Sequence, residues 1–311
     1  MAVQARLLAG QGVQQGSALA EVHSPGGAQI KLRVLRRVRV SRHSTLWAGV
    51  GASRFTGPVA IKVPHADSIA FQAVAREAWV LSRLRHAGIP TLIGHGRVTG
   101  DVEGEFGLRS GMACLASRFG GACQLFDRLG TLDWPTLKRY LLGAAVSLQH
   151  VHDVGFLHCD IKPSNLLVNQ NRGRIMIVDF GSAMVLRDKV AADGGIESAD
   201  GGIPLGSPAY MAPEHFLRDS SSIGPWSDLY SLGCTAYALA TSSMPFGGKS
   251  YMALRQEHLF DPPPLDRLRA EFSGEFTDWV SWLLAKEASA RPQSAIEAAN
   301  ALETIGRETV S

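Results

Sequence analysis

The sequence has few cysteines and no long apolar segment. Its four cysteines, Cys114, Cys123, Cys159 and Cys234, form no CxxC pair, so neither a disulfide framework nor a structural zinc site is expected, and a reducing cytoplasm suits this usage. The most apolar internal stretch, residues 234–240, is far shorter than the roughly 18 residues that a membrane-spanning helix needs. The first residues also lack the apolar run of a signal peptide. We therefore expect a cytoplasmic protein without a membrane anchor.

A strong charge of either sign is also absent. The 311 residues include 31 Lys and Arg against 28 Asp and Glu, a formal net charge of +3, so the charge of the whole chain does not favour nucleic acid as a partner. One local exception is a basic run within residues 31–42. It is compatible with docking of an acidic partner or nucleic acid, but arginines on the solvent face of two strands explain it more simply.

The predicted elements indicate two lobes. Residues 1–28 are rich in Gly, Gln, Ala and Ser and are expected to be a loose extension or at most a peripheral strand. Alternating runs at 30–35 and 59–63 predict half-buried strands, and a helix is expected over 68–85. Its predicted buried stripe is Phe71, Val74, Ala78, Leu81 and Leu84.

Beyond residue 125 the apolar spacing becomes helical. With hydrophobic residues at 45% of the chain, a large core is available. Strands first and helices afterwards predict an α+β fold. We expect a bilobal domain over 29–305, with a small antiparallel sheet and one helix in about 29–119, a larger helical lobe in about 120–305, and a tail at 306–311. The further helices are predicted at 134–151, 226–241, 248–258, 274–285 and 293–305.

Two short strings in the second half of the chain carry most of the functional information. Residues 158–165 read His158-Cys159-Asp160-Ile161-Lys162-Pro163-Ser164-Asn165, and residues 179–181 read Asp179-Phe180-Gly181. For Asp160 or Asn165 alone, a turn-capping role is the simpler interpretation. In this order and at this spacing, the strings resemble the catalytic loop and metal-binding motif of the eukaryotic-type (Hanks-type) serine/threonine protein kinases. The resemblance extends from about residue 35 to 302, and in style the chain is similar to soluble bacterial members.

The resemblance implies a role for each polar residue in the two strings. Asp160 is expected to accept the proton of the substrate hydroxyl, and Lys162, which is typical of serine/threonine rather than tyrosine kinases, to stabilise charge on the transferred phosphate. Asn165 and Asp179 are expected to bind Mg²⁺, or Mn²⁺, together with ATP. Phosphoryl transfer needs such a set, because cations and metal ligands position the phosphates while one residue orients the acceptor.

A strand in the first half of the chain supplies the expected nucleotide site. Residues 59–62 read Val59-Ala60-Ile61-Lys62, the strand motif of the family, and alternation places Ala60 and Lys62 on one face. The resemblance implies that Lys62 holds the phosphates of ATP and pairs with Glu77 on the following helix. It also implies an adenine enclosure of Leu46, Ala60 and Leu167, and an internal apolar spine of Leu81, His158 and Phe180.

A third string, at residues 206–214, indicates the kind of substrate. It reads Gly206-Ser207-Pro208-Ala209-Tyr210-Met211-Ala212-Pro213-Glu214 and resembles the peptide-docking end of a kinase activation loop. This favours a protein substrate with a Ser or Thr acceptor over a small-molecule phosphotransferase. By the same resemblance, Asp228 is expected to hold the catalytic loop and Arg291 to pair with Glu214.

The sequence departs from the family pattern at two places. The glycine-rich turn over the phosphates is replaced by residues 39–44, without a glycine. Either the amides of Ser41 and Ser44 cap the phosphates less closely, or nucleotide binds poorly and the chain is a pseudokinase scaffold; because the catalytic side chains remain, we favour the first alternative. Cys159 also replaces an arginine that grips a phosphorylated loop, so we expect activity that does not depend on loop phosphorylation, with Ser198 and Ser207 as the candidate phosphorylation sites. Autophosphorylation is expected from the kinase activity itself.

Overall fold

A computed structural model describes most of the chain as two compact units. The N-terminal unit comprises residues 18–85 and 90–122, and the C-terminal unit residues 86–89 and 123–306. This division matches an α+β protein in which strands precede helices. The described residues are 18–51, 57–103, 107–118, 122–169, 173–186, 206–217, 221–269 and 272–306.

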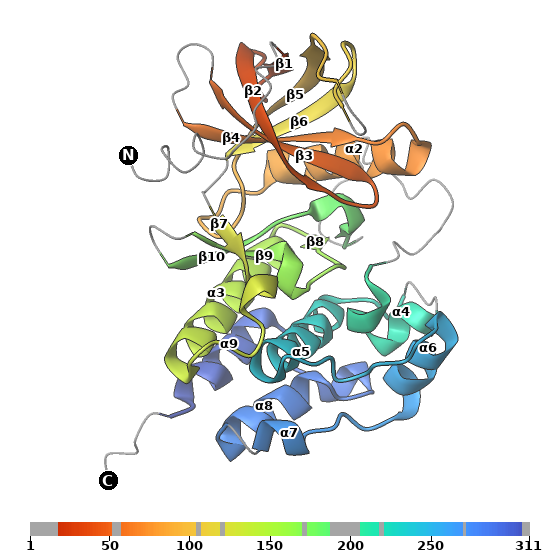
Figure 1. Ribbon diagram of the computed structural model, residues 1–311. Helices are drawn as coiled ribbons and strands as arrows, with labels where there is room; N and C mark the ends of the chain where they lie inside the picture. The colour runs from red at the N-terminus through yellow and green to blue at the C-terminus, as the bar shows by residue number, and fades with distance from the viewer. Residues whose placement is uncertain are drawn as a thin grey trace. The chain divides into compact units, whose positions relative to one another are not determined.

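The N-terminal unit is a closed antiparallel barrel with the strand order β1-β2-β3-β4-β6-β5 (Figure 1). The predicted strands at 30–35 and 59–63 are confirmed as parts of β2 and β4. The strands are β1 (Leu19–His23), β2 (Gln29–Val40), β3 (Ser44–Gly51), β4 (Pro58–Pro64), β5 (Leu92–Thr99) and β6 (Ala113–Arg118).

Strand β1 closes the barrel by pairing with β2 on one side and with β5 on the other. The close approach of β1 and β5 requires glycine at position 96, because a Cβ there would lie 1.9 Å from the carbonyl oxygen of Glu21. The extension that we expected over residues 1–28 therefore contributes a strand to the barrel. Residues 1–17 lie outside the described residues.

The alternation of β3 and β4 separates two sets of side chains. Trp47 is paired with Ile61, and both are buried in the barrel core. Leu46 is paired with Lys62, and both are only partly buried, on the opposite face of the same two strands. One face of this strand pair thus builds the core, while the other presents Lys62 outside it.

Helix α2 (Ser68–Arg83) confirms the helix predicted over 68–85. It begins at Asp67, whose carboxylate accepts a hydrogen bond of 2.7 Å from the amide of Ala70. The predicted buried stripe is confirmed at Val74, Leu81 and Leu84 but is wrong at Phe71, which is 55% exposed, because the face turned inward includes Ala70 and Glu77 instead. Glu77 therefore lies within the buried stripe.

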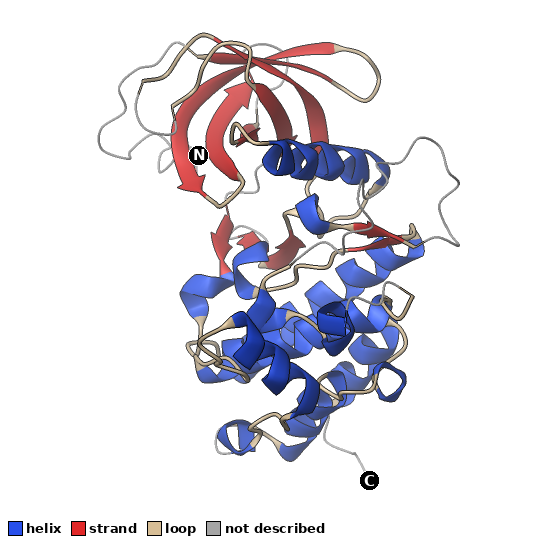
Figure 2. Cartoon of the chain, turned by 90° about the vertical axis from the view of Figure 1, so that its right-hand side faces the viewer, coloured by secondary structure: helices blue, strands red, loops and turns tan. Residues whose placement is uncertain are grey.

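The C-terminal unit is mainly helical (Figure 2). Its helices begin where the sequence supplies caps: Asp133 accepts from the amide of Thr136 before α3, and Ser294 accepts from the amide of Glu297 before α9. The five helices predicted after residue 125 are confirmed. The helices are α3 (Trp134–Asp153), α4 (Pro213–Leu217), α5 (Pro225–Thr241), α6 (Tyr251–Phe260), α7 (Asp266–Arg269), α8 (Gly274–Leu283) and α9 (Ala295–Thr304).

Helix α5 is the centre of this unit. Its residues 227–240 are all buried, and it packs against α3, α8 and α9. Short strands lie beside this helical core and carry the motif residues: β7 (Ala122–Gln124), β9 (Leu166–Asn169) and β10 (Arg174–Ile177) form one sheet, and β8 (Phe156–Leu157) pairs with β11 (Met184–Val185). None of the described helices combines the length and apolar character that crossing a bilayer requires.

Candidate active site

The fully buried Asp228 of α5 fixes the loop at residues 158–165 through hydrogen bonds to its backbone. Its carboxylate accepts hydrogen bonds of 2.8 Å from the amides of His158 and Cys159 and contacts Nε2 of His152 at 2.8 Å. Burial alone would raise the pKa of Asp228, but the hydrogen bond and charge of His152 hold it below its ordinary value. These bonds stabilise Cys159 at a φ of 61°, in the left-handed region.

Asp160 stands at the centre of a polar cluster. Its Oδ2 accepts from Lys162 Nζ at 2.6 Å, and its Oδ1 accepts from the amide of Ser207 at 2.9 Å. The same ammonium donates to Ser207 Oγ at 2.7 Å. Asp160 and Lys162 are 11% and 20% exposed, so the pair is shielded yet accessible. A carboxylate fixed in this way can orient a hydroxyl, with a cation beside it.

Asn165 lies directly beside Asp160. Its Nδ2 donates to the backbone oxygen of Asp160 at 2.9 Å and to Oδ2 at 3.0 Å, so Oδ1 is the atom that Asn165 can offer to a metal. The amide of Val178 donates to the backbone oxygen of Asn165 at 3.0 Å, which brings the segment ending at Asp179 alongside. An amide oxygen and a carboxylate are hard oxygen ligands, and Mg²⁺ takes one or two carboxylates plus phosphate oxygens. The donor set therefore fits magnesium.

Asp179 adopts the left-handed conformation, with a φ of 71°. The next residue, Phe180, is fully buried and meets the ring of His158 edge-on, with ring centroids 4.8 Å apart. Burial lowers the pKa of His158, whose Nε2 lies 3.0 Å from the backbone oxygen of Val178. Packing of Phe180 against His158 thus fixes the position of the backbone beside Asp179. Leu81, the third predicted spine residue, is buried on α2 of the other unit.

In the N-terminal unit, Lys62 and Glu77 form an ion pair. Nζ of Lys62 lies 2.5 Å from Oε2 of Glu77, and the side chains are 16% and 8% exposed. The cross-strand pairing places Leu46 and Ala60 on the face of the sheet that carries Lys62. In the C-terminal unit, the predicted adenine contact Leu167 is a half-buried residue of β9. The cation and apolar residues expected of a nucleotide site are thus present in the units to which the sequence assigned them.

The hairpin between β2 and β3 uses Ser41 and Ser44 for its own closure. The amide of Ser41 donates to the backbone oxygen of Ser44 at 2.8 Å, and the amide of Ser44 donates to Ser41 Oγ at 3.2 Å. The two hydroxyl oxygens lie 3.1 Å apart, and Ser44 is buried. The donors that we expected to face phosphates are therefore occupied within the turn.

A second buried ion pair lies between Glu214 and Arg291, as expected. The guanidinium donates to the carboxylate at 2.8 and 3.0 Å, and Ser227 Oγ donates to it at 2.5 Å. Burial would raise the pKa of Glu214, but Arg291 outweighs it and holds the pKa below its ordinary value. This pair fixes the end of the segment that begins near Ser207.

Sequence reasoning missed the contributions of His152 and Ser207. His152 contacts Asp228 although 76 residues separate them, and Ser207 reaches Asp160 across 47 residues. The sequence marks Ser207 only as a phosphorylation candidate. The other candidate, Ser198, lies outside the described residues. Gly206 is the sequence feature that could have indicated the contact of Ser207. A Cβ at this position would lie 2.4 Å from the backbone oxygen of Cys159, so only glycine lets this segment approach the catalytic loop.

Comparison with known proteins identifies the family. Residues 54–303 match the protein kinase domain model. The chain is 31% identical over 283 residues to the serine/threonine-protein kinase pkn2 of Myxococcus xanthus, covering 88% of this chain and 32% of that protein. It is 35% identical over 247 residues to the DNA damage-responsive serine/threonine-protein kinase RqkA of Deinococcus radiodurans, covering 76% and 34%. It is also 29% identical over 248 residues to serine/threonine-protein kinase PknB of Mycolicibacterium smegmatis, covering 77% and 37%.

The chain therefore belongs to the protein kinase family and has the protein kinase fold. It is similar to bacterial serine/threonine kinases of the Hanks type. The chain spans about a third of the length of these curated relatives, as the covered shares of 32%, 34% and 37% show.

Proposed function

We propose that the chain is a serine/threonine protein kinase that transfers the γ-phosphoryl group of ATP to hydroxyl groups of a protein substrate. The observation that carries the proposal is the arrangement in which Lys162 contacts both Asp160 and Ser207 while Asn165 donates to Asp160. This cluster supplies a carboxylate to orient the acceptor hydroxyl and an ammonium to balance charge on the moving phosphoryl group.

The remaining assignments concern nucleotide and metal. Lys62, held by Glu77, is proposed to bind the phosphates, because a cation fixed by a buried carboxylate keeps its place while the phosphates arrive. Asn165 and Asp179 are proposed to hold Mg²⁺, which when bound neutralises the phosphate charge. Leu46, Ala60 and Leu167 are proposed to enclose the adenine. Ser41 and Ser44 enter the proposal only as residues that set the shape of the hairpin, since their donors bond each other.

We further propose that activity does not require phosphorylation of the activation loop. Cys159 is 5% exposed and has no guanidinium with which to grip a phosphate. Ser207 instead forms hydrogen bonds directly with Asp160 and Lys162, which supports a docking segment ordered without a phosphate group. A Ser198→Ala variant is expected to keep its activity within about threefold; loss of nearly all activity would contradict this part of the proposal.

Phosphate transfer with labelled ATP and Mg²⁺ tests the activity itself. We expect autophosphorylation and phosphorylation of a Ser- or Thr-containing peptide, with no transfer to the same peptide carrying Tyr. An Asp160→Asn variant is expected to lose about a hundredfold or more of the rate, since general-base assistance contributes about 10²–10⁴-fold. Asp278→Asn, an exposed aspartate on α8, serves as the matched control. Equal incorporation by wild type and Asp160→Asn would refute the assignment.

A pseudokinase scaffold is the second candidate, favoured by the closed hairpin at Ser41 and Ser44. A thermal-shift titration with millimolar ATP and Mg²⁺ separates the two, because a ligand that binds only the folded state raises its apparent stability. A kinase is expected to give a shift that Lys62→Met weakens. No shift, together with no phosphate transfer, would favour the scaffold.

A further inference from the structure

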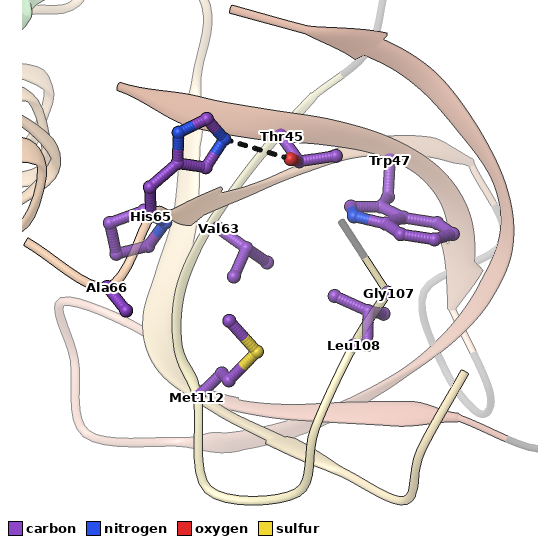
Figure 3. Close-up of a pocket in the computed structure, with 9 residues that line it drawn as sticks. Thr45, Trp47, Val63, His65, Ala66, Gly107, Leu108 and Met112 are labelled. Carbon is purple, nitrogen blue, oxygen red and sulfur yellow. Dashed lines mark hydrogen bonds between the residues drawn. The ribbon is translucent and has the colours of Figure 1, made fainter. Parts of the chain in front are cut away.

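The barrel of the N-terminal unit carries a cavity of about 320 Å³ that is partly open to solvent. Its wall is formed by side chains from β3 and β4 and from the connection between β5 and β6 (Figure 3). Trp47 and Val63 line it, on the face of the sheet opposite Leu46 and Lys62. The cavity is therefore separate from the face that carries the proposed nucleotide residues, and no step of phosphoryl transfer uses it.

One wall holds a polar atom without a partner. Trp47 is 5% exposed, and its Nε1 is buried without a hydrogen-bond acceptor among the described residues. Figure 3 shows the nitrogen edge of the indole turned toward the side of the cavity on which Val63 lies. An unsatisfied buried donor is costly, and native structures contain few of them. An acceptor on a bound molecule would remove this cost.

The other polar groups of the wall already bond each other. Thr45 Oγ1 lies 3.2 Å from Nε2 of His65, the contact drawn in Figure 3. His65 Nδ1 lies 3.1 Å from the backbone oxygen of Arg42. Both ring nitrogens of His65 are thus engaged, which leaves Trp47 Nε1 as the wall donor without an acceptor among the described residues. Because this nitrogen is buried, a ligand reaches it only when a neighbouring side chain moves.

The composition of the wall restricts the ligand further. Among the described residues that line the cavity there is no Lys, Arg, Asp or Glu, so a charged molecule would enter without a counter-ion. The indole of Trp47 and the thioether of Met112 favour an aromatic ring, since both make specific contacts with aromatic groups. The flexible side chain of Met112, which is only partly buried, can move to admit a ligand.

Size sets the last limit. A cavity of about 150 Å³ holds one benzene ring, and this cavity has about twice that volume, at the lower end of the roughly 300–1,000 Å³ seen for ligand pockets. We infer that the barrel cavity binds a neutral bicyclic aromatic molecule whose carbonyl group accepts a hydrogen bond from Trp47 Nε1.

Two probes of equal size test the inference: acetylnaphthalene, which has the carbonyl acceptor, and ethylnaphthalene, substituted at the same ring position, which lacks it. Dissociation constants are measured on the full chain by isothermal titration calorimetry. We expect acetylnaphthalene to bind about fivefold more tightly, the ratio that one net hydrogen bond of about 1 kcal/mol provides. Absence of binding by both probes, or equal affinity for the two, would overturn the inference.

Three variants locate the binding site. Trp47→Phe keeps an aromatic ring but removes the donor, so the two probes are expected to bind within about twofold of each other. Met112→Trp fills the cavity and is expected to abolish binding; if thermal unfolding shows that it does not fold, Met112→Phe replaces it. Ala60→Leu, on the opposite face of β4, is expected to leave probe binding unchanged. Binding that survives filling of the cavity would overturn the inference without bearing on kinase activity. Binding that Ala60→Leu removes would also overturn it, and would place the probes at the proposed adenine enclosure instead.

Discussion

His65 Nδ1 lies 3.1 Å from the backbone oxygen of Arg42, at the tip of the hairpin between β2 and β3. The amide of His65 also donates to the backbone oxygen of His43 at 2.9 Å, and its Nε2 contacts Thr45 Oγ1. A hairpin without glycine is thereby fastened to the end of β4. We interpret His65 as the residue that sets the position of this hairpin. In a glycine-rich turn the backbone is flexible and has no such side-chain contact to fix it.

Replacement of His65 is therefore expected to affect nucleotide binding more than chemistry. In His65→Ala, loss of two side-chain hydrogen bonds loosens the hairpin, and we expect the KM for ATP to rise about threefold to tenfold while kcat changes less than about twofold. Steady-state kinetics with varied ATP measure both constants. His43→Ala, which removes an imidazole from the same hairpin but leaves the contacts of His65 in place, is the control. A fall in kcat at unchanged KM would contradict this interpretation.

The hydroxyl of Ser207 gives a second prediction. Ser207→Ala removes the acceptor of the 2.7 Å hydrogen bond from Lys162 Nζ, and hydrogen bonds to charged groups contribute about 1.5–3 kcal/mol. We expect the kcat/KM for a peptide substrate to fall about tenfold or more, whereas Ser207→Thr retains the hydroxyl and most of the activity. Peptide phosphorylation assays of the two variants side by side make the comparison. Equal losses in both would show that the bond is unimportant.

The buried pair of Glu214 and Arg291 predicts a large effect on stability. Glu214→Gln leaves the guanidinium buried without a countercharge, which typically costs about 3–5 kcal/mol of the free energy of unfolding. Urea unfolding monitored by circular dichroism measures the difference. The exposed pair of Lys31 and Glu21, at 58% and 30% exposure, is the matched control, and Glu21→Gln is expected to cost less than about 1 kcal/mol. Similar costs for both variants would contradict the prediction.

His258 predicts a dependence of stability on pH. Burial, and to a smaller extent the charge of Lys286, lowers the pKa of His258 from the ordinary value of 6.5 to about 3. Between pH 3 and 6.5 the unfolded chain binds a proton at this histidine that the folded protein does not bind. The contribution of His258 to the free energy of unfolding is therefore fully present above pH 6.5 and decreases as the pH falls toward 3.

The expected slope for His258 is about 1.4 kcal/mol per pH unit in that window. His258→Phe, in a site already lined by Phe216 and Phe246, is expected to flatten the slope by about this amount. His95→Gln, an exposed histidine on β5, is expected to leave it unchanged. Unfolding in urea at pH 4.5, 5.5 and 6.5 measures the slopes, and an unaltered slope in His258→Phe would refute the prediction.

Local patterns in the sequence predicted the parts of this protein that depend on neighbours along the chain. The alternation around Lys62 predicted a strand with one polar face, and the helical spacing after Trp134 predicted α3, because side-chain periodicity reports directly on backbone conformation. The order of the short strings around Asp160 and Asp179 indicates the family from the sequence alone.

What depends on distant residues was harder to predict. Strand β1 is only five residues long and becomes a strand through pairing with β2 and with β5, about seventy-five residues later. Phe71 fits the helical period, but the period alone does not say which edge of the stripe faces inward. The contact between Ser207 and Asp160 depends on the path of the intervening chain, which no local pattern encodes.

Closure of the barrel by β1 also bears on how shortened versions of the protein would behave. The match to the protein kinase domain begins at residue 54, so a chain trimmed to that boundary loses β1, β2 and β3. Even a cut at residue 29 removes β1 and leaves the backbone groups of β2 and β5 unpaired along one edge each. Unprotected strand edges recruit strands from other molecules. Self-association of such truncated chains would then result from the missing strand and would not be a property of the intact protein.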